Sequence, residues 1–115
     1  MSGLETTEMW RHFFAGMRME NAPSWNLLWH LYAMSDNALT AAQLAERMHI
    51  PREGVIRLMN AMGVDAAMQT GLSPVPDRND GWQIFFSRRP NPNGEWVYSI
   101  NEMFLPILGS FRLHK

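Results

Sequence analysis

The segment from Leu39 to Gly63 constrains the fold more than any other part of the chain, because its spacing fits two short helices joined by a tight turn. Thr40 and Gln43 stand three residues apart, as in a capping box that closes the start of a helix. Pro51 suits the first turn of a second helix, and Gly63 suits the end of that helix. The segment therefore predicts a helix-turn-helix.

The composition argues for one compact domain and against several classes of protein. The chain has 115 residues, of which 46% are hydrophobic, and this is enough to bury a core of its own. It has no cysteine, so it offers neither a disulfide framework nor a thiolate zinc site, and this suits the reducing cytoplasm. No apolar run approaches the roughly 20 residues that span a bilayer, so we expect no membrane insertion. We therefore predict a single cytoplasmic domain over residues 1–115.

Two further helices and a short strand are expected ahead of the helix-turn-helix. Residues from about 4 to 19 carry apolar side chains at helical spacing, namely Met9, Trp10, Phe13, Phe14 and Met17. Ser24 can cap a second helix that ends near Ser35-Asp36-Asn37, and Ala38-Leu39 can form a very short strand. A terminal helix as apolar as the first one leaves an apolar face in solvent unless another surface packs against it. We expect a second copy of the chain to provide that surface, so the first helix and the last are candidate dimerisation elements.

Between Val64 and Gly81 the pattern is less regular: Asp65 to Gln69 can make a helical turn, and the residues from Ser73 to Gly81 are expected to be loop. After this segment the apolar pattern changes from helical to alternating. Trp82–Ser87 and Trp96–Ile100 both alternate, which predicts two antiparallel strands, and Asn93-Gly94 between them favours a hairpin turn. Asn101 can cap a final helix over about residues 102–111. The expected fold is therefore mainly α with a small β-hairpin (α+β), a winged helix-turn-helix in which the hairpin is the wing.

This order of elements resembles the winged-helix repressors of the multiple-antibiotic-resistance regulator (MarR) family, and the resemblance covers most of the chain. The residues that carry it are Trp25-Asn26-Leu27-Leu28-Trp29, Leu39-Thr40-Ala41-Ala42-Gln43-Leu44-Ala45, Gly71-Leu72 and Ser99-Ile100-Asn101-Glu102. His49 stands where such turns often have glycine, so a left-handed backbone is expected there. The resemblance implies a homodimeric repressor of promoter DNA, with a small-molecule effector that stays unknown.

The predicted recognition helix, residues 52–62, leaves its polar side chains outward when its apolar positions face the core. Arginine can bind guanine through two hydrogen bonds, asparagine can bind adenine likewise, and glutamate can accept from cytosine. A capped helix N-terminus can hold a phosphate, and a wing over residues 88–94 can reach the backbone or the minor groove. The predicted DNA-binding residues are Thr40, Arg52, Glu53, Arg57, Asn60, Arg88, Arg89 and Asn93.

A second interpretation is a winged helix that binds protein rather than DNA. The net charge of −1 and the outward apolar Ile56 favour it, and Glu53 can simply pair with Arg57 one helical turn away. Other chemistry finds little support, because the four histidines lack metal-ligand spacing and no nucleophile lies in a recognisable motif. We therefore expect no metal, no cofactor and no catalytic activity.

Overall fold

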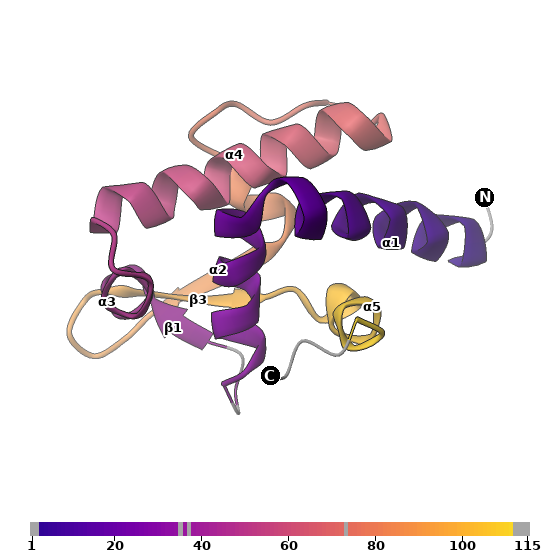
Figure 1. Ribbon diagram of the computed structural model, residues 1–115. Helices are drawn as coiled ribbons and strands as arrows, with labels where there is room; N and C mark the ends of the chain where they lie inside the picture. The colour runs from indigo at the N-terminus through magenta and orange to yellow at the C-terminus, as the bar shows by residue number, and fades with distance from the viewer. Residues whose placement is uncertain (1–2, 35, 37, 73, 112–115) are drawn as a thin grey trace.

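The computed structural model describes residues 3–34, 36, 38–72 and 74–111 (Figure 1). It is mainly helical with a small antiparallel sheet of three strands, which agrees with the expected α+β class. The elements in chain order are α1 (Gly3–Glu20), α2 (Ala22–Tyr32), β1 (Ala38–Thr40), α3 (Ala41–Met48), α4 (Arg52–Thr70), the 3₁₀ turn η1 (Gly81–Ile84), β2 (Phe86–Pro90), β3 (Trp96–Ile100), the 3₁₀ turn η2 (Glu102–Phe104) and α5 (Leu105–Gly109).

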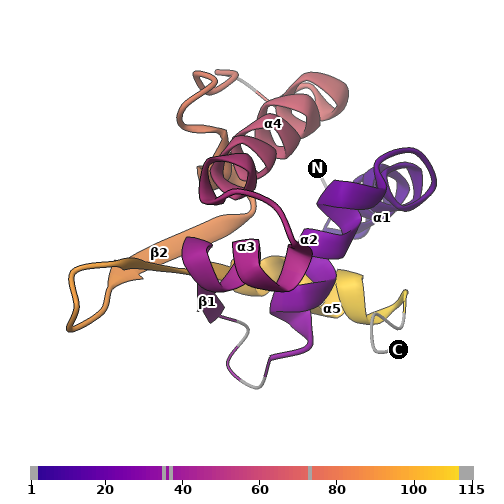
Figure 2. The ribbon, with the colours of Figure 1, turned by 60° about the vertical axis from the view of Figure 1, so that its left-hand side comes forward.

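The sheet joins the hairpin to the start of α3. Its order is β1-β3-β2, so the middle strand β3 pairs with β1 through Thr40 and Val97, and with β2 through Arg88 and Tyr98. The hairpin projects from the body beside α3 (Figure 2). Because β1 runs directly into α3, the three-stranded sheet fixes the hairpin relative to the first of the two predicted DNA-binding helices.

The prediction that the second helix ends at Gly63 is wrong. Helix α4 continues to Thr70 and ends at Gly71, whose φ of 75° is the left-handed conformation that favours glycine. Gly63 instead lets α4 approach η1, since a Cβ atom on Gly63 would lie 1.7 Å from the carbonyl oxygen of Gly81. The connection after α4 is therefore shorter than the segment over residues 64–81 and runs back over the outer side of α4 (Figure 1).

The first predicted strand, Trp82–Ser87, is wrong from Trp82 to Phe85. Gly81–Ile84 is a 3₁₀ turn, and the strand β2 begins only at Phe86. The backbone of this turn is held against α4, where the side-chain oxygen of Asn60 accepts a hydrogen bond from the N–H of Trp82 at 3.0 Å. That contact between distant segments overrides the alternating pattern. The second predicted strand, Trp96–Ile100, is confirmed.

Two predicted helix caps are also wrong. Asn21 caps α2 by accepting a hydrogen bond from the N–H of Ser24, while the Ser24 hydroxyl is buried and has no hydrogen-bond partner among the described residues. Asn101 makes no side-chain cap; its amide donates to the carbonyl of Ile84. The single helix predicted over 102–111 is therefore a 3₁₀ turn followed by the short α5.

The end of α2 differs from its predicted position. This helix ends at Tyr32, before the predicted stop at Ser35-Asp36-Asn37, of which Ser35 and Asn37 lie outside the described residues. Asp36 is described, and its carboxylate accepts a hydrogen bond from the N–H of Ala38 at the start of β1. The short strand expected at Ala38-Leu39 is confirmed and extends to Thr40.

The aromatic side chains of α1 lie inside the chain's own core. Trp10, Phe13 and Phe14 are buried against Phe85 and Phe104, and the ring centroids of Trp10 and Phe104 are 5.0 Å apart. The ring of Phe13 stacks on that of Phe85, with centroids 5.8 Å apart. Phe85, at the end of η1, and Phe104, in η2, therefore cover these side chains within the chain. The expected homodimer through the first or the last helix stays a prediction.

Candidate nucleic-acid interface

The turn between α3 and α4 has the local geometry that the sequence predicts. The side-chain oxygen of Thr40 accepts from the N–H of Gln43 at 3.1 Å, and Gln43 accepts in return from the N–H of Thr40 at 2.9 Å. His49 is left-handed, with φ of 58°, and ends α3. Pro51 lies one position earlier than predicted, as the N-cap residue of α4. The capping box fixes the start of α3, and the left-handed His49 ends it where the chain turns toward α4.

The N-terminal turns of α4 present charged side chains to solvent. Arg52, Glu53 and Arg57 are all exposed, and the segment that follows α4 leaves this end of the helix uncovered (Figure 1). No salt bridge joins Glu53 to Arg57 in the described part of the chain, so the simple i, i+4 pair does not form. Both charges are therefore open to a ligand.

Asn60 faces inward, contrary to its predicted place on the outer side of α4. Its side chain is only 8% exposed, and its oxygen accepts the hydrogen bond from the backbone of Trp82. The sequence could not show this contact, because it depends on how η1 packs against α4. Asn60 thus links α4 to η1 and lacks the exposure that a base-reading side chain needs.

The hairpin expected around Asn93-Gly94 forms, and its turn is built around Asn91. The side-chain oxygen of Asn91 accepts from the N–H groups of Asn93 and Glu95, both at 2.9 Å. Gly94 follows with φ of 81° and donates its N–H to the carbonyl of Asn91, so a three-residue loop closes the hairpin. The side chain of Asn93 is exposed at this tip, and that of Arg89 is exposed on β2.

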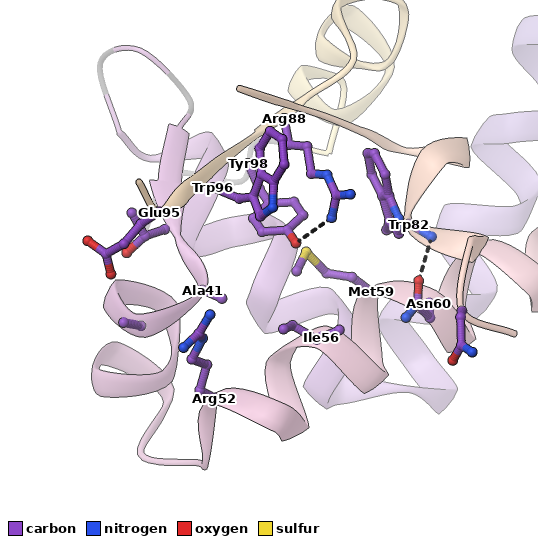
Figure 3. Close-up of a pocket in the computed structure, with 13 residues that line it drawn as sticks. Ala41, Arg52, Ile56, Met59, Asn60, Trp82, Arg88, Glu95, Trp96 and Tyr98 are labelled. Carbon is purple, nitrogen blue, oxygen red and sulfur yellow. Dashed lines mark hydrogen bonds between the residues drawn. The ribbon is translucent and has the colours of Figure 1, made fainter. Parts of the chain in front are cut away.

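Arg88 lies between two tryptophan rings instead of extending freely from the hairpin. Its guanidinium carbon is 4.3 Å from the ring centroid of Trp82 and 4.4 Å from that of Trp96. It also donates to the hydroxyl of Tyr98 at 3.3 Å (Figure 3). Cation–π contacts of this kind stabilise by about 0.5–2 kcal/mol each. They hold the hairpin against η1 and fix the position of the Arg88 charge.

A cavity of about 160 Å³ lies where the start of α3, the outer side of α4 and the hairpin meet. Arg52 borders it from α4 and Arg88 from β2, and Figure 3 shows both side chains around the same space. Glu95 is the acidic side chain in the lining. Thr40 also borders it, but its side chain is buried and its oxygen already accepts the capping hydrogen bond. Two cationic side chains from separate elements thus border one cavity.

Most of the predicted site residues line either the cavity or a second groove on α4, and two of them line neither. Thr40, Arg52, Asn60 and Arg88 line the cavity, while Glu53 and Arg57 line a groove farther along α4, which Asn60 also borders. Neither lining includes Arg89 or Asn93. Sequence reasoning missed Trp82, Trp96, Tyr98 and Arg78. The alternation that places Trp96 and Tyr98 on one face of a strand was the signal for two of them.

The remaining titratable groups add little to this interface. Burial and, secondarily, the nearby charge of Arg47 lower the pKa of His30, so the neutral imidazole is favoured there. Among the described residues, no three His, Asp or Glu side chains gather closely enough to hold a metal ion. No helix in the described part of the chain is both long and apolar enough to cross a membrane.

Comparison with protein-family models, with curated protein sequences and with solved structures finds no match for this chain. The function is therefore inferred from the positions and contacts of the residues themselves.

Proposed function

We propose that the protein is a sequence-specific double-stranded DNA-binding transcriptional regulator with a winged helix-turn-helix, resembling MarR-type repressors. The observation that carries the proposal is that Arg52 of α4 and Arg88 of β2 border one cavity between α3, α4 and the hairpin. In this proposal the N-terminal turns of α4 enter the major groove, and the hairpin is the wing. The phosphate backbone follows the hairpin side of the cavity, where Arg88 lies, and Arg52 faces the bases from α4. Such a regulator acts in the cytoplasm and performs no catalytic step.

The recognition part of α4 is narrower than residues 52–62 in this proposal. Arg52 and Arg57 are exposed and reach outward, whereas Asn60 is committed to the contact with Trp82. In helix-turn-helix proteins the N-terminal residues of the second helix contact the base edges. Base reading is therefore assigned to the first two turns, with Glu53 beside the two arginines.

We expect single arginine substitutions to separate base reading from phosphate binding. Arg52→Ala and Arg57→Ala should each lose about 1–3 kcal/mol of discrimination at particular base pairs, because each removes a bidentate contact. Arg89→Ala should weaken binding to all sequences about equally and lower the salt slope by about one for each lost phosphate contact. The measurement is fluorescence anisotropy on a duplex selected from a random library and on its scrambled version, at several salt concentrations.

Arg18→Ala on α1 is the matched control, since Arg18 is equally exposed but lies outside both linings. It should leave affinity and salt slope unchanged. Equal affinity of all four variants and the parent for both duplexes would contradict the DNA proposal.

A homodimer belongs to the same proposal. The net charge of −1 gives one chain weak non-specific attraction to DNA, and a two-fold dimer doubles the number of arginines at the duplex. It would also place two recognition helices about 34 Å apart, one turn of DNA. Light scattering at micromolar concentration should give the mass of two chains. A single-chain mass at high micromolar concentration would remove the dimer from the proposal.

The second candidate function is a winged helix that binds a protein partner without DNA. The observation in its favour is an apolar strip on the outer side of α4, where Met68 is 68% exposed and Ile56 and Val64 are partly exposed. A protein interface would keep its affinity as salt rises more readily than a phosphate contact would. The salt titration described above therefore distinguishes the two functions.

A further inference from the structure

Trp96 differs from the other tryptophans of the chain in its exposure. Of the five tryptophans, Trp10 is buried, and Trp25, Trp29 and Trp82 are half-buried against the core. Trp96 lies at the start of β3 and is 44% exposed, and it is the one exposed aromatic side chain in the described part of the chain. A ring of this size normally contributes to a core or to an interface. Its exposed surface is therefore a candidate binding surface.

The ring of Trp96 is held in place from one side. The guanidinium carbon of Arg88 lies over it, 4.4 Å from the ring centroid, and the same guanidinium contacts Trp82 and donates to the hydroxyl of Tyr98. The pairing of Trp96 with Pro90 fixes the strand that carries the ring. The face opposite Arg88 is therefore presented in a fixed orientation, so a flat group that stacks on it does not have to order the side chain first.

The charges around Trp96 favour a polyanion. Arg88 lies on β2, which pairs with the strand of Trp96, and Arg52 borders the same cavity from α4. Neither guanidinium forms a salt bridge in the part of the chain that the structure describes. The carboxylate of Glu95 points away from Trp96 and Arg52 (Figure 3). An exposed aromatic ring beside cationic side chains is the combination with which proteins bind unpaired nucleotides, since the base stacks on the ring and the phosphate meets the charge.

The cavity beside Trp96 is too small for a drug-sized molecule. Its volume is about 160 Å³, whereas pockets that enclose such molecules usually measure about 300–1,000 Å³. Trp96 and Tyr98 border it from β3, and Arg52 and Ile56 border it from α4. A ligand that uses this cavity therefore inserts one group and leaves the rest of its structure outside, as a nucleic-acid strand does when a single base leaves the stack.

We propose that the cavity binds an unpaired nucleotide, with the base stacked on Trp96 and facing Arg52, and with the phosphate bound by Arg88. Arg88 contacts Trp82 and Trp96 through its flat faces and donates one hydrogen bond to Tyr98, so N–H groups remain at its edge for a phosphate. Since this site rests on the proposed DNA-binding function, it adds a preference to that function. The regulator binds a duplex with a bulged or flipped base more tightly than a fully paired one.

Two oligonucleotides of equal charge test the site without a duplex. The first is 5′-phosphorylated tetrathymidylate, and the second has the same phosphates but tetrahydrofuran residues in place of the nucleosides, so it offers no base. We expect calorimetry at low salt to give at least about tenfold tighter binding of tetrathymidylate, because each base that stacks on an aromatic side chain strengthens binding. Equal binding of the two, or no binding of tetrathymidylate at millimolar concentration, overturns the site. The exposed ring would then favour a protein partner.

Variants assign the stacking to Trp96. Trp96→Ala should lower the affinity for tetrathymidylate to that for the abasic tetramer, and Trp96→Phe should keep part of the difference because it keeps a ring. The affinity for the abasic tetramer should stay the same in both variants, because it depends on the arginines. Val75→Ala is the control, since Val75 is 47% exposed but lies outside the cavity lining, and it should change neither affinity. An undiminished difference in Trp96→Ala, or an equal loss for both tetramers in a variant that keeps the circular dichroism of the parent, overturns the assignment to the ring.

Bulged duplexes test the same contact in double-stranded DNA. One extra thymidine is placed at each position of the selected duplex in turn, and each bulged duplex is compared with its counterpart that carries an abasic residue there. We expect fluorescence anisotropy to show at least about tenfold tighter binding of the thymidine bulge at one position or at two neighbouring ones, and no such difference with Trp96→Ala. Equal binding of each pair at every position overturns the preference for an unpaired base and leaves the proposed function standing. Binding of tetrathymidylate by a protein that binds no duplex keeps the site and instead removes the proposed function.

Discussion

Gly63→Ala is expected to destabilise the protein by about 3 kcal/mol or more. The added methyl group would lie 1.7 Å from the carbonyl oxygen of Gly81, and a backbone atom cannot move aside as a flexible side chain can. Overpacking a dense interior typically costs about 1–3 kcal/mol, and a clash with the backbone lies at the upper end of that range or above it. Urea unfolding followed by circular dichroism should show a correspondingly lower midpoint.

Gly16→Ala is the matched control for this prediction. Gly16 lies within α1, and a Cβ atom there would meet nothing within 4 Å. Alanine in an open helix position should stabilise by about 0.4–1 kcal/mol, because it restricts the unfolded chain without straining the folded one. If both variants had equal stability, the close approach of α4 and η1 would be contradicted.

Phe85→Ala is expected to have a comparable or larger effect, of about 3–5 kcal/mol, on the free energy of unfolding. Phe85 is fully buried, and its ring lies 5.0 Å from that of Phe104 and 5.6 Å from that of Trp10, measured between centroids. Removing it leaves a cavity where α1, η1 and η2 meet, and phenylalanine-to-alanine changes in cores cost this much. Thermal and urea unfolding should both report the loss.

Met103→Ala provides the comparison on the surface of the same region. Met103 is 57% exposed, and its replacement should change stability by no more than about 0.5 kcal/mol. A loss below about 1 kcal/mol for Phe85→Ala would mean that the α1 aromatics are not covered within the chain. That result would favour a second subunit as the surface that packs against α1, as the sequence predicts.

Features whose causes are local could be predicted from the sequence. The capping box of Thr40 and Gln43 and the left-handed His49 each depend on residues within one helical turn, and both are confirmed. Glycine is common just after a helix end, so the sequence predicts an end at Gly63. The actual neighbour of Gly63 is Gly81, which belongs to another segment. The pattern of one helix does not report where a second backbone will approach it.

The residues of the candidate site also divide into those whose positions have local causes and those whose positions depend on contacts between distant segments. Arg52 and Arg57 are exposed as predicted, because the apolar positions Val55, Met59 and Met62 fix the buried side of α4. The role of Asn60 could not be predicted, since its partner is a backbone N–H of η1. The contact of Arg88 with Trp96 follows from the register that pairs Arg88 with Tyr98, and its contact with Trp82 follows from the position of η1. An alternating pattern alone determines neither.

The strand order also dictates a sequence of events during synthesis. Helix α3 begins directly after β1, but the strand that pairs with β1 begins only at Trp96, near the end of the described chain. The helices before that point emerge from the ribosome and can form through local contacts, whereas the sheet must wait until β3 has been made. A polypeptide interrupted before β3 therefore keeps the residues of α3 and α4 but lacks the strand that fixes them to the hairpin.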